Sequence, residues 1–194
     1  MRRASAWTAI GMVTVLALSA GGAAGGEKTG SGVSVYDFEK GMPAGWKLES
    51  LRGEGAKTTP SAELETHGAN TVLELGKDAR MVMEHGDLLN FSIEAVVRRE
   101  YDTSGSHVGF EFRNGYRVYL RKPGRVELTG PNSARGRGFS RNRVTHKPLK
   151  LKLVVVGPIV RFFIDGRYEG QFDQLEMTPG PVCLYQRGTQ HNVY

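Results

Sequence analysis

Apolar and polar residues alternate with a period of two along much of this 194-residue chain, most regularly in two segments. These segments are Gly115–Arg121 (GYRVYLR) and Leu149–Gly170 (LKLKLVVVGPIVRFFIDGRYEG). Each is marked by a dipeptide that favours a tight hairpin turn, Asn114-Gly115 or Asp165-Gly166. Such alternation next to Asn-Gly or Asp-Gly is a strong local sign of antiparallel strands. The pattern therefore predicts a sheet protein whose strands have one apolar and one polar face.

Three central segments show this alternation in turn: Phe91–Arg99, His107–Arg113 and Tyr116–Arg121. We expect them to form an antiparallel meander, because strands that follow one another in sequence usually pair. Each should cover a core on one side only. The residues expected to face the core are Phe91, Ile93, Ala95, Val97, Val108, Phe110, Phe112, Tyr116, Val118 and Leu120.

The rest of the chain adds shorter strand candidates and no helical stripe of useful length. About a dozen short strands at regular spacing predict an all-β fold, a two-sheet antiparallel sandwich. The further strand candidates are Val33–Phe38, Trp46–Leu51, Thr71–Leu75, Arg80–Glu84, Val126–Thr129, Pro181–Gln186 and His191–Tyr194.

The first 26 residues have the order of a secretory signal peptide: two arginines, an apolar run from Ala4 to Ala20, and the small-residue stretch Ala20–Gly26. We expect cleavage between Ser19 and Gly26, with no membrane span after removal and a secreted, periplasmic or cell-envelope location. Residues 27–32 then form a polar lead, and residues 33–194 a single domain. Cys183 is the only cysteine, so the domain depends on its core, in which we expect Cys183 to be a small buried residue.

Positive charge is concentrated in the middle of the chain. From Arg113 to Lys152 there are 12 lysines and arginines and a single acid, Glu127. Within this zone, residues 130–148 have no periodicity and predict a long basic loop that carries Arg135, Arg137, Arg141 and Arg143. The asymmetry favours an acidic polymer as partner. Nucleic acid is disfavoured, because the protein is expected to be exported and only Phe139 interrupts the arginines as a stacking group.

One group of polar residues should share the outward face of two neighbouring central strands: His107, Glu111, Arg113, Arg117, Tyr119 and Arg121. Arginine can hold hydroxyls or carboxylates through its fork of donors, and tyrosine can stack on a sugar ring. We therefore regard Glu111, Arg113, Arg117, Tyr119 and Arg121 as candidate ligand-binding residues. The alternative is ordinary cross-strand pairing of Glu111 with an arginine on a solvated face. His107 and Glu111 are also a candidate acid–base pair on one strand face.

Three stretches resemble the concanavalin A-like lectin/glucanase sandwich, which includes laminin-G-like modules and 3-keto-disaccharide hydrolases. They are VYDFEKGMPAGW, the late hairpin LKLKLVVVGPIVRFFIDGRYEG and the closing GPVCLYQRGTQHNVY; SHVGFEFRNGYRVYL is similar to the central strands of the hydrolase group. The resemblance implies a jelly-roll sandwich with a carbohydrate-related role for its concave sheet. It also makes Asp37 and Glu39 candidates for a structural calcium site, although the expected binding role requires no cofactor.

Two features depart from that family. The glucanase branch carries Glu-x-Asp-x-x-Glu, and the nearest match, Glu100 to Gly105, lacks the third carboxylate. The chain also stops at Tyr194, where the family's closing strand runs on, so we expect a clipped chain or a shortened strand.

We therefore expect a secreted, non-catalytic module that binds poly- or oligosaccharide, with acidic glycans as candidate ligands. The alternatives are a glycoside-acting hydrolase of the 3-keto-disaccharide type and a structural or protein-binding laminin-G-like module.

Overall fold

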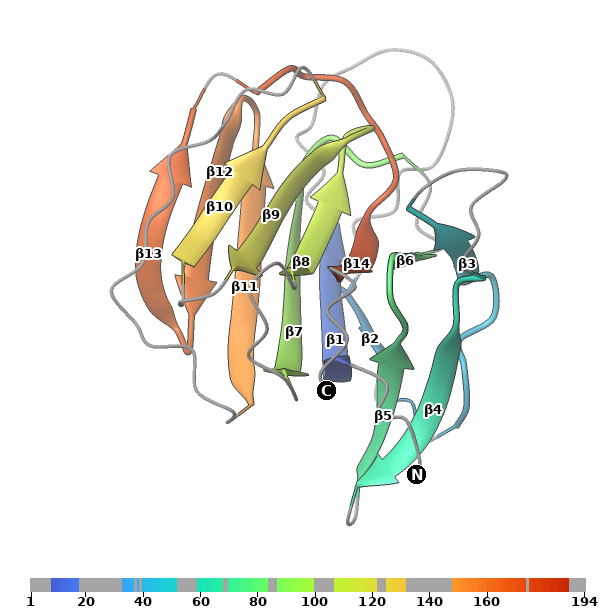
Figure 1. Cartoon of the computed structure of the whole chain (residues 1–194). Coiled ribbons are helices and arrows are strands. Elements are labelled where there is room, and N and C mark those ends of the chain that lie inside the picture. Colours follow the sequence, from blue (N-terminus) through green and yellow to red (C-terminus); the bar gives the residue numbers. More distant parts are fainter. Residues whose placement is uncertain are drawn as a thin grey trace.

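The protein folds as two packed antiparallel sheets in the computed structural model (Figure 1). The structure describes residues 8–17, 33–36, 38, 40–51, 59–67, 70–83, 87–99, 107–121, 125–131, 148–173 and 175–188. These residues form strands and turns, and none of them is helical. The expected all-β, two-sheet antiparallel sandwich is confirmed.

The larger sheet has eight strands. Seven of them follow the order β13-β12-β11-β7-β1-β5-β4, and β2 pairs with part of β1. Their bounds are β1 Thr8–Ala17, β2 Val33–Tyr36, β4 Ala62–His67, β5 Asn70–Leu75, β7 Phe91–Arg99, β11 Leu149–Val156, β12 Ile159–Ile164 and β13 Arg167–Phe172.

The smaller sheet has six strands in the order β10-β9-β8-β14-β6-β3. It brings together segments that are far apart in the chain, because β14 from the C-terminal part lies between β8 and β6. The bounds are β3 Lys47–Ser50, β6 Ala79–Val82, β8 His107–Phe112, β9 Tyr116–Arg121, β10 Arg125–Thr129 and β14 Cys183–Arg187.

The core lies between the two sheets and consists of the residues that alternation predicts to face inward. All ten expected inward residues of the central segments are buried, from Phe91 to Leu120. Phe91 of the larger sheet meets Phe112 of the smaller one edge to face, with ring centroids 5.7 Å apart. The late hairpin contributes Leu151, Leu153 and Phe162 to the same core. Period-two alternation therefore identifies the buried face of each strand correctly.

The expected three-strand meander is wrong, because β7 and β8 lie in different sheets. β7 pairs with β11 and β1, whereas β8 pairs with β9 and β14. Both strands have an apolar face, and placing them in opposite sheets buries those faces against each other. Only β8 and β9 form the expected hairpin, which β10 extends.

Both predicted hairpin turns form, but the first is displaced by one residue. Asp165 and Gly166 have φ values of 49° and 79°, the left-handed pair typical of a two-residue turn. In the other hairpin the central residues are Arg113 and Asn114, with φ values of 45° and 56°, and the Gly115 N–H donates to the Phe112 carbonyl at 3.3 Å. β8 therefore ends at Phe112, before Arg113.

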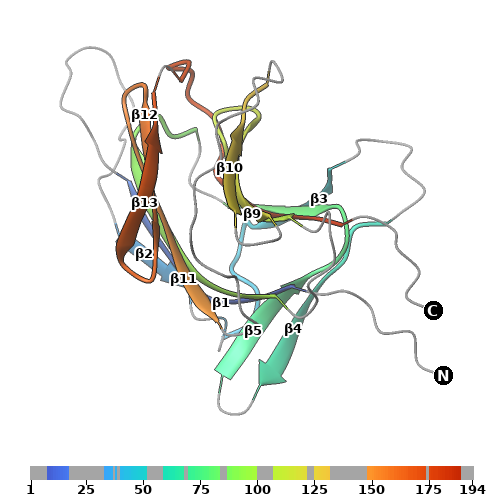
Figure 2. The same ribbon diagram turned by 60° about the vertical axis from the view of Figure 1, so that its left-hand side comes forward.

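The two sheets bend in the same direction, with the six-stranded sheet on the inside of the bend (Figure 2). Its outer face, called the concave face below, is hollowed, and the outer face of the eight-stranded sheet is convex. At one side Trp46 packs edge to face on the buried Phe38, with centroids 5.7 Å apart. Trp46 is partly buried and packs against the core.

Strand β1 lies inside the segment predicted to be a cleaved signal peptide, and it pairs with β7, β5 and β2. Cleavage and the domain bounds stay predictions. Strand β4, which alternation did not indicate, pairs with β5 along its full length. No helix among the described residues has the length and apolarity needed to cross a membrane. The strand predicted at His191–Tyr194 lies outside the described residues.

Candidate functional site

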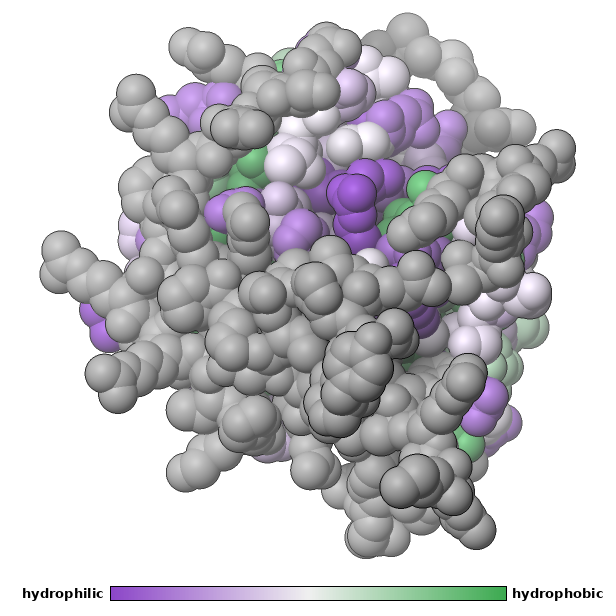
Figure 3. Space-filling view, viewed as in Figure 1, coloured by the Kyte–Doolittle hydropathy of each residue, from purple (hydrophilic) through white to green (hydrophobic). Residues whose placement is uncertain are grey.

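Polar and aromatic residues form two adjacent rows on the concave face. The backbone register places one residue from each of the six strands in each row. Hydrophilic residues gather where Figure 1 shows β8, β9 and β14 (Figure 3). The first row is Glu49, Arg80, Tyr185, Gly109, Tyr119 and Glu127, and the second is Lys47, Val82, Cys183, Glu111, Arg117 and Thr129.

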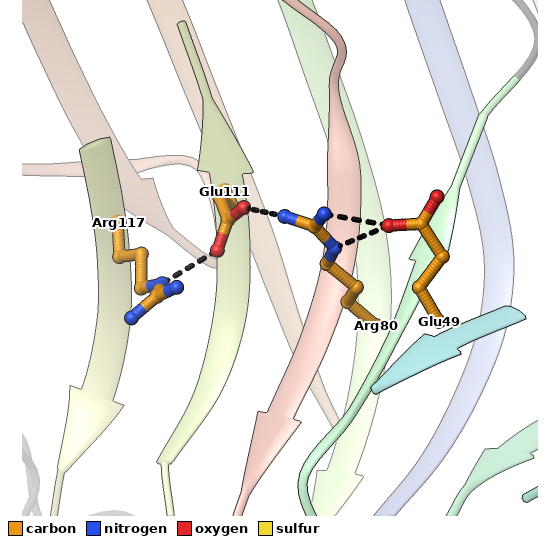
Figure 4. Close-up of polar contacts among 4 residues, drawn as sticks. All are labelled: Glu49, Arg80, Glu111 and Arg117. Carbon is orange, nitrogen blue, oxygen red and sulfur yellow. Dashed lines mark hydrogen bonds and ion pairs between the residues drawn. The ribbon is translucent and has the colours of Figure 1, made fainter. Parts of the chain in front are cut away.

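Four of these side chains form a ladder of alternating charge, in the order Glu49, Arg80, Glu111 and Arg117 (Figure 4). Arg80 donates from Nε and Nη2 to Oε2 of Glu49, at 2.8 and 2.5 Å, and from Nη1 to Oε1 of Glu111. Arg117 donates from Nε to Oε2 of Glu111 at 2.5 Å. Each oxygen of Glu111 thus accepts from a different guanidinium.

Burial differs along this charge ladder. The Glu111 side chain is 5% exposed, whereas those of Arg80 and Arg117 are each 31% exposed. Burial alone lowers the pKa of Arg80, but the charge of Glu111 and the hydrogen bond to Glu49 outweigh it and raise that pKa above its usual value. Glu111 is therefore a buried anchor that holds two half-exposed cations on the concave face.

A small side chain on β14 lets this ladder cross the sheet. Arg80 on β6 and Glu111 on β8 are separated by β14, where Cys183 lies opposite Glu111. Cys183 is fully buried, and burial together with the charge of Glu111 raises the pKa of its thiol to about 12. The thiol is therefore protonated and unreactive at neutral pH, as expected for a small packing residue.

Aromatic rings flank the charge ladder. His107 stacks on Tyr119 with centroids 4.4 Å apart and an interplanar angle of 16°, and Tyr119 meets Tyr185 edge to face at 6.0 Å. The Arg117 guanidinium lies 5.8 Å from the centroid of the Tyr185 ring. Gly109 lies between the two tyrosines in its row, so no side chain separates the rings. The two tyrosine rings form the floor beneath Arg117.

Tyr119 and Tyr185 differ in how their hydroxyls are satisfied. The Tyr119 hydroxyl donates to Oε2 of Glu127 at 3.1 Å. The Tyr185 hydroxyl is buried and has no hydrogen-bond partner among the described residues. Burial, and next the neighbouring Tyr119, raise the pKa of Tyr185 well above its usual value. Tyr185 therefore stays neutral and serves as a packed ring.

The charge ladder leaves donors for a ligand. Among the described residues, the only hydrogen bond made by the Arg117 guanidinium is that of Nε to Glu111, so its two terminal nitrogens remain for ligand oxygens. A guanidinium fixed through Nε presents two parallel donors, the geometry that suits a carboxylate, a sulfate or a pair of sugar hydroxyls.

The geometry does not favour His107 and Glu111 as an acid–base pair. They lie four residues apart on one strand, which corresponds to about 13 Å between their Cα atoms. His107 is stacked on Tyr119, and both oxygens of Glu111 are occupied by arginines.

The expectation that Arg113 shares this face is wrong. Arg113 is 1% exposed and donates to three backbone carbonyls, those of Leu89, Gly157 and Glu176. The reason is the displaced turn, since Arg113 has left the strand and its alternation no longer applies. Burial lowers its pKa. Arg113 therefore links the β8–β9 turn to other chain segments and lies away from the ligand-binding candidates.

Structure brings Glu111, Arg117, Tyr119 and His107 together as expected, and it adds Glu49, Arg80 and Tyr185. The added residues belong to β14, β6 and β3, which follow β8 in that order across the sheet, and local alternation cannot predict this order. Arg121 lies opposite His107 in the backbone register. Its side chain, the loop residues Arg135, Arg137, Arg141 and Arg143, and Asp37 and Glu39 lie outside what the structure describes. Within the described part, no group of three potential ligands could hold a metal ion.

Comparison with known proteins finds a likeness in fold and none in sequence. No family profile and no curated protein sequence matches this chain. Among solved structures, the carbohydrate-binding module CBM66 from Bacillus subtilis is similar, with a TM-score of 0.50 and 12% sequence identity. The match covers 74% of this chain and 92% of that one. At this identity the likeness supports the β-sandwich fold, and the concanavalin A-like assignment stays a prediction.

Proposed function

We propose that this protein is an exported carbohydrate-binding module whose ligand lies on the concave face. The observation that carries the proposal is the charge ladder, in which the buried Glu111 fixes Arg117 with its terminal nitrogens unoccupied, beside stacked rings. Sugar recognition commonly uses several hydrogen-bond donors, and this face offers those of Arg117, which is held over rings that are themselves buried: Tyr119 is 6% and Tyr185 1% exposed. The fold likeness to a carbohydrate-binding module supports the same function.

The charges of this face favour an acidic sugar. Its described acids are already engaged: Glu49 and Glu111 with arginines, and Glu127 with the Tyr119 hydroxyl. Lys47 and Arg187 are exposed on the same face. Spare positive charge without a competing free carboxylate suits a uronate or a sulfated sugar.

The geometry favours neither alternative function, the laminin-G-like module or the hydrolase. A protein-binding laminin-G-like module would be favoured by a face without concavity, and the six-stranded sheet is concave (Figure 2). A hydrolase needs paired catalytic groups, whereas His107 is stacked on Tyr119 and both oxygens of Glu111 are held by arginines. Release of sugar from a 3-keto-glycoside, lost in Glu111→Gln, would nevertheless overturn the binding-module proposal.

Binding of tetragalacturonate and of the neutral maltotetraose, measured by calorimetry at two salt concentrations, tests the proposal. We expect Arg117→Ala to weaken tetragalacturonate binding about tenfold or more and to reduce its salt dependence. Tyr119→Ala should weaken binding similarly at both salt concentrations, because it removes an uncharged ring that packs against Tyr185 beneath Arg117. Lys40→Ala, which removes one exposed charge elsewhere, is the control. Equal binding by Arg117→Ala, Tyr119→Ala and the parent would place the ligand elsewhere.

A further inference from the structure

A pair of aromatic rings, one exposed and one half-buried, lies on the convex face, opposite the proposed site. Phe163 of β12 faces Tyr168 of β13 in register, with ring centroids 5.7 Å apart and an interplanar angle of 63°. Tyr168 is 54% exposed, and neither ring belongs to the buried core. Single exposed apolar residues are common on proteins, but two adjacent rings on an outer sheet face are a surface that can bind a ligand.

A β-bulge produces this pairing. The register between β12 and β13 shifts between Phe162, which faces Gly170, and Phe163, which faces Tyr168. Without the extra residue, Phe163 would face Glu169. The bulge instead places Tyr168 beside Phe163, while the Glu169 side chain is only 7% exposed. Bulges commonly re-aim side chains at functional positions.

Positive charge borders the pair. Lys152 of β11 lies opposite Phe163, so Lys152, Phe163 and Tyr168 form a row about 10 Å long across three strands. The neighbouring Glu94 forms an ion pair with Lys150, whose Nζ lies 2.7 Å from Oε1 of Glu94.

The exposed Arg161, two residues before Phe163, is oriented by a 3.0 Å bond from its Nε to Oε1 of Gln171. Its terminal nitrogens make no hydrogen bond to the described residues. The two rings are therefore bordered by Lys152 across the strands, on β11, and by the fixed guanidinium of Arg161 along β12.

We propose that Phe163 and Tyr168, with Lys152 and Arg161, form a second carbohydrate-binding surface that takes a short stretch of acidic oligosaccharide. The rings offer stacking surface and the two cations offer partners for carboxylate or sulfate groups. A row about 10 Å long and one side chain wide covers on the order of 100 Å², far less than the roughly 800 Å² that each partner contributes to a stable protein interface. The size and charge of this surface therefore fit a sugar chain better than a folded protein. Because the two surfaces lie on opposite faces, one molecule would bridge two chains of an acidic polysaccharide.

Titration of the isotope-labelled 194-residue chain with tetragalacturonate, followed by NMR of backbone amides, tests this proposal separately from the concave site. We expect shifts at Lys152, Phe163 and Tyr168, and a loss of affinity of roughly two- to tenfold at those amides in Tyr168→Ala. Val156→Ser is the matched control, because Val156 is 53% exposed on the same sheet and lies outside the row.

The positions of the shifted amides distinguish failure of the concave site from failure of the second surface. Shifts confined to β8, β9 and β14 would overturn the second surface and leave the concave site standing. Shifts confined to β11, β12 and β13 that are lost in Tyr168→Ala would support it and overturn the concave site. Shifts at β12 and β13 that persist unchanged in Tyr168→Ala would overturn the aromatic surface, and no shifts anywhere would overturn both sites for this ligand class.

Discussion

Arg113 is a buried cation whose described hydrogen bonds all go to backbone carbonyls. It joins three segments, through the carbonyls of Leu89, Gly157 and Glu176. We expect Arg113→Met to lower the free energy of unfolding by about 3 kcal/mol, because it removes the three hydrogen bonds that the buried Arg113 donates to part-buried carbonyls. Arg113→Lys should recover part of this loss, since an ammonium group can reach fewer of the carbonyls. Urea denaturation measures both variants; equal midpoints for Arg113→Met and the parent would contradict the linking role.

Tyr185 provides a second test at the scale of one residue. Its buried hydroxyl has no hydrogen-bond partner in the part of the chain that the structure describes, so Tyr185→Phe should leave the free energy of unfolding at pH 7 unchanged or raise it by up to about 1 kcal/mol. Because the folded-state pKa of Tyr185 is raised by burial, the folded state holds the proton more tightly than the unfolded state. The contribution of this tighter proton binding to the free energy of unfolding is complete below about pH 10 and is lost as the pH rises above 10.

Tyr185→Phe cannot lose that contribution, so its advantage over the parent should grow above pH 10, by about 1.4 kcal/mol for each pH unit. Melting temperatures at pH 7 and pH 11 check this. If the melting temperatures of the parent and the variant differ by the same amount at both pH values, the Tyr185 hydroxyl is solvated or hydrogen-bonded.

At the scale of strands, local alternation predicts which residues are buried, because a strand has only two faces. It correctly places Val108, Phe110 and Phe112 in the core. It does not predict partners, since the position of β14 between β8 and β6 depends on contacts between residues about 70 to 100 positions apart. The local pattern also does not fix which residues form a turn. The β8–β9 turn lies one residue earlier than predicted, and this places Arg113 in the interior rather than on the sheet face.

Gly109 gives a prediction for the β8–β9 hairpin. A Cβ atom at this position would lie 2.1 Å from the Val118 carbonyl oxygen and 2.7 Å from the Tyr119 Cα, both backbone atoms of the paired strand. Gly109→Ala should therefore force β8 and β9 apart, lower the free energy of unfolding by about 2 kcal/mol or more, and weaken sugar binding through Tyr119. Gly157→Ala, where a Cβ has open space but φ is 55°, is a control that should cost about 1 kcal/mol. An equal cost at both glycines, measured by denaturation, would show that backbone strain alone matters.

At the scale of the whole molecule, the eight-stranded sheet depends on a strand that export is expected to remove. β1 lies between β7 and β5, and its backbone pairs with β7 from Thr8 to Ala17. Signal-peptide composition predicts cleavage after this strand, between Ser19 and Gly26. The exported protein would then lack the strand that joins the β4–β5 hairpin to β7.

Removal of β1 would turn β7 into an edge strand of the larger sheet. Hydrogen exchange of the chain 1–194 is compared with that of residues 27–194, the two forms being identified by mass. Amides of β7 that face β1 should exchange about tenfold faster or more in the shorter form, because an edge strand leaves its N–H groups open to water. Amides of the β8–β9 hairpin, which lie in the other sheet, serve as the internal control and should not change. Equal protection of β7 in both forms would mean that a different strand occupies the position of β1 in the exported protein.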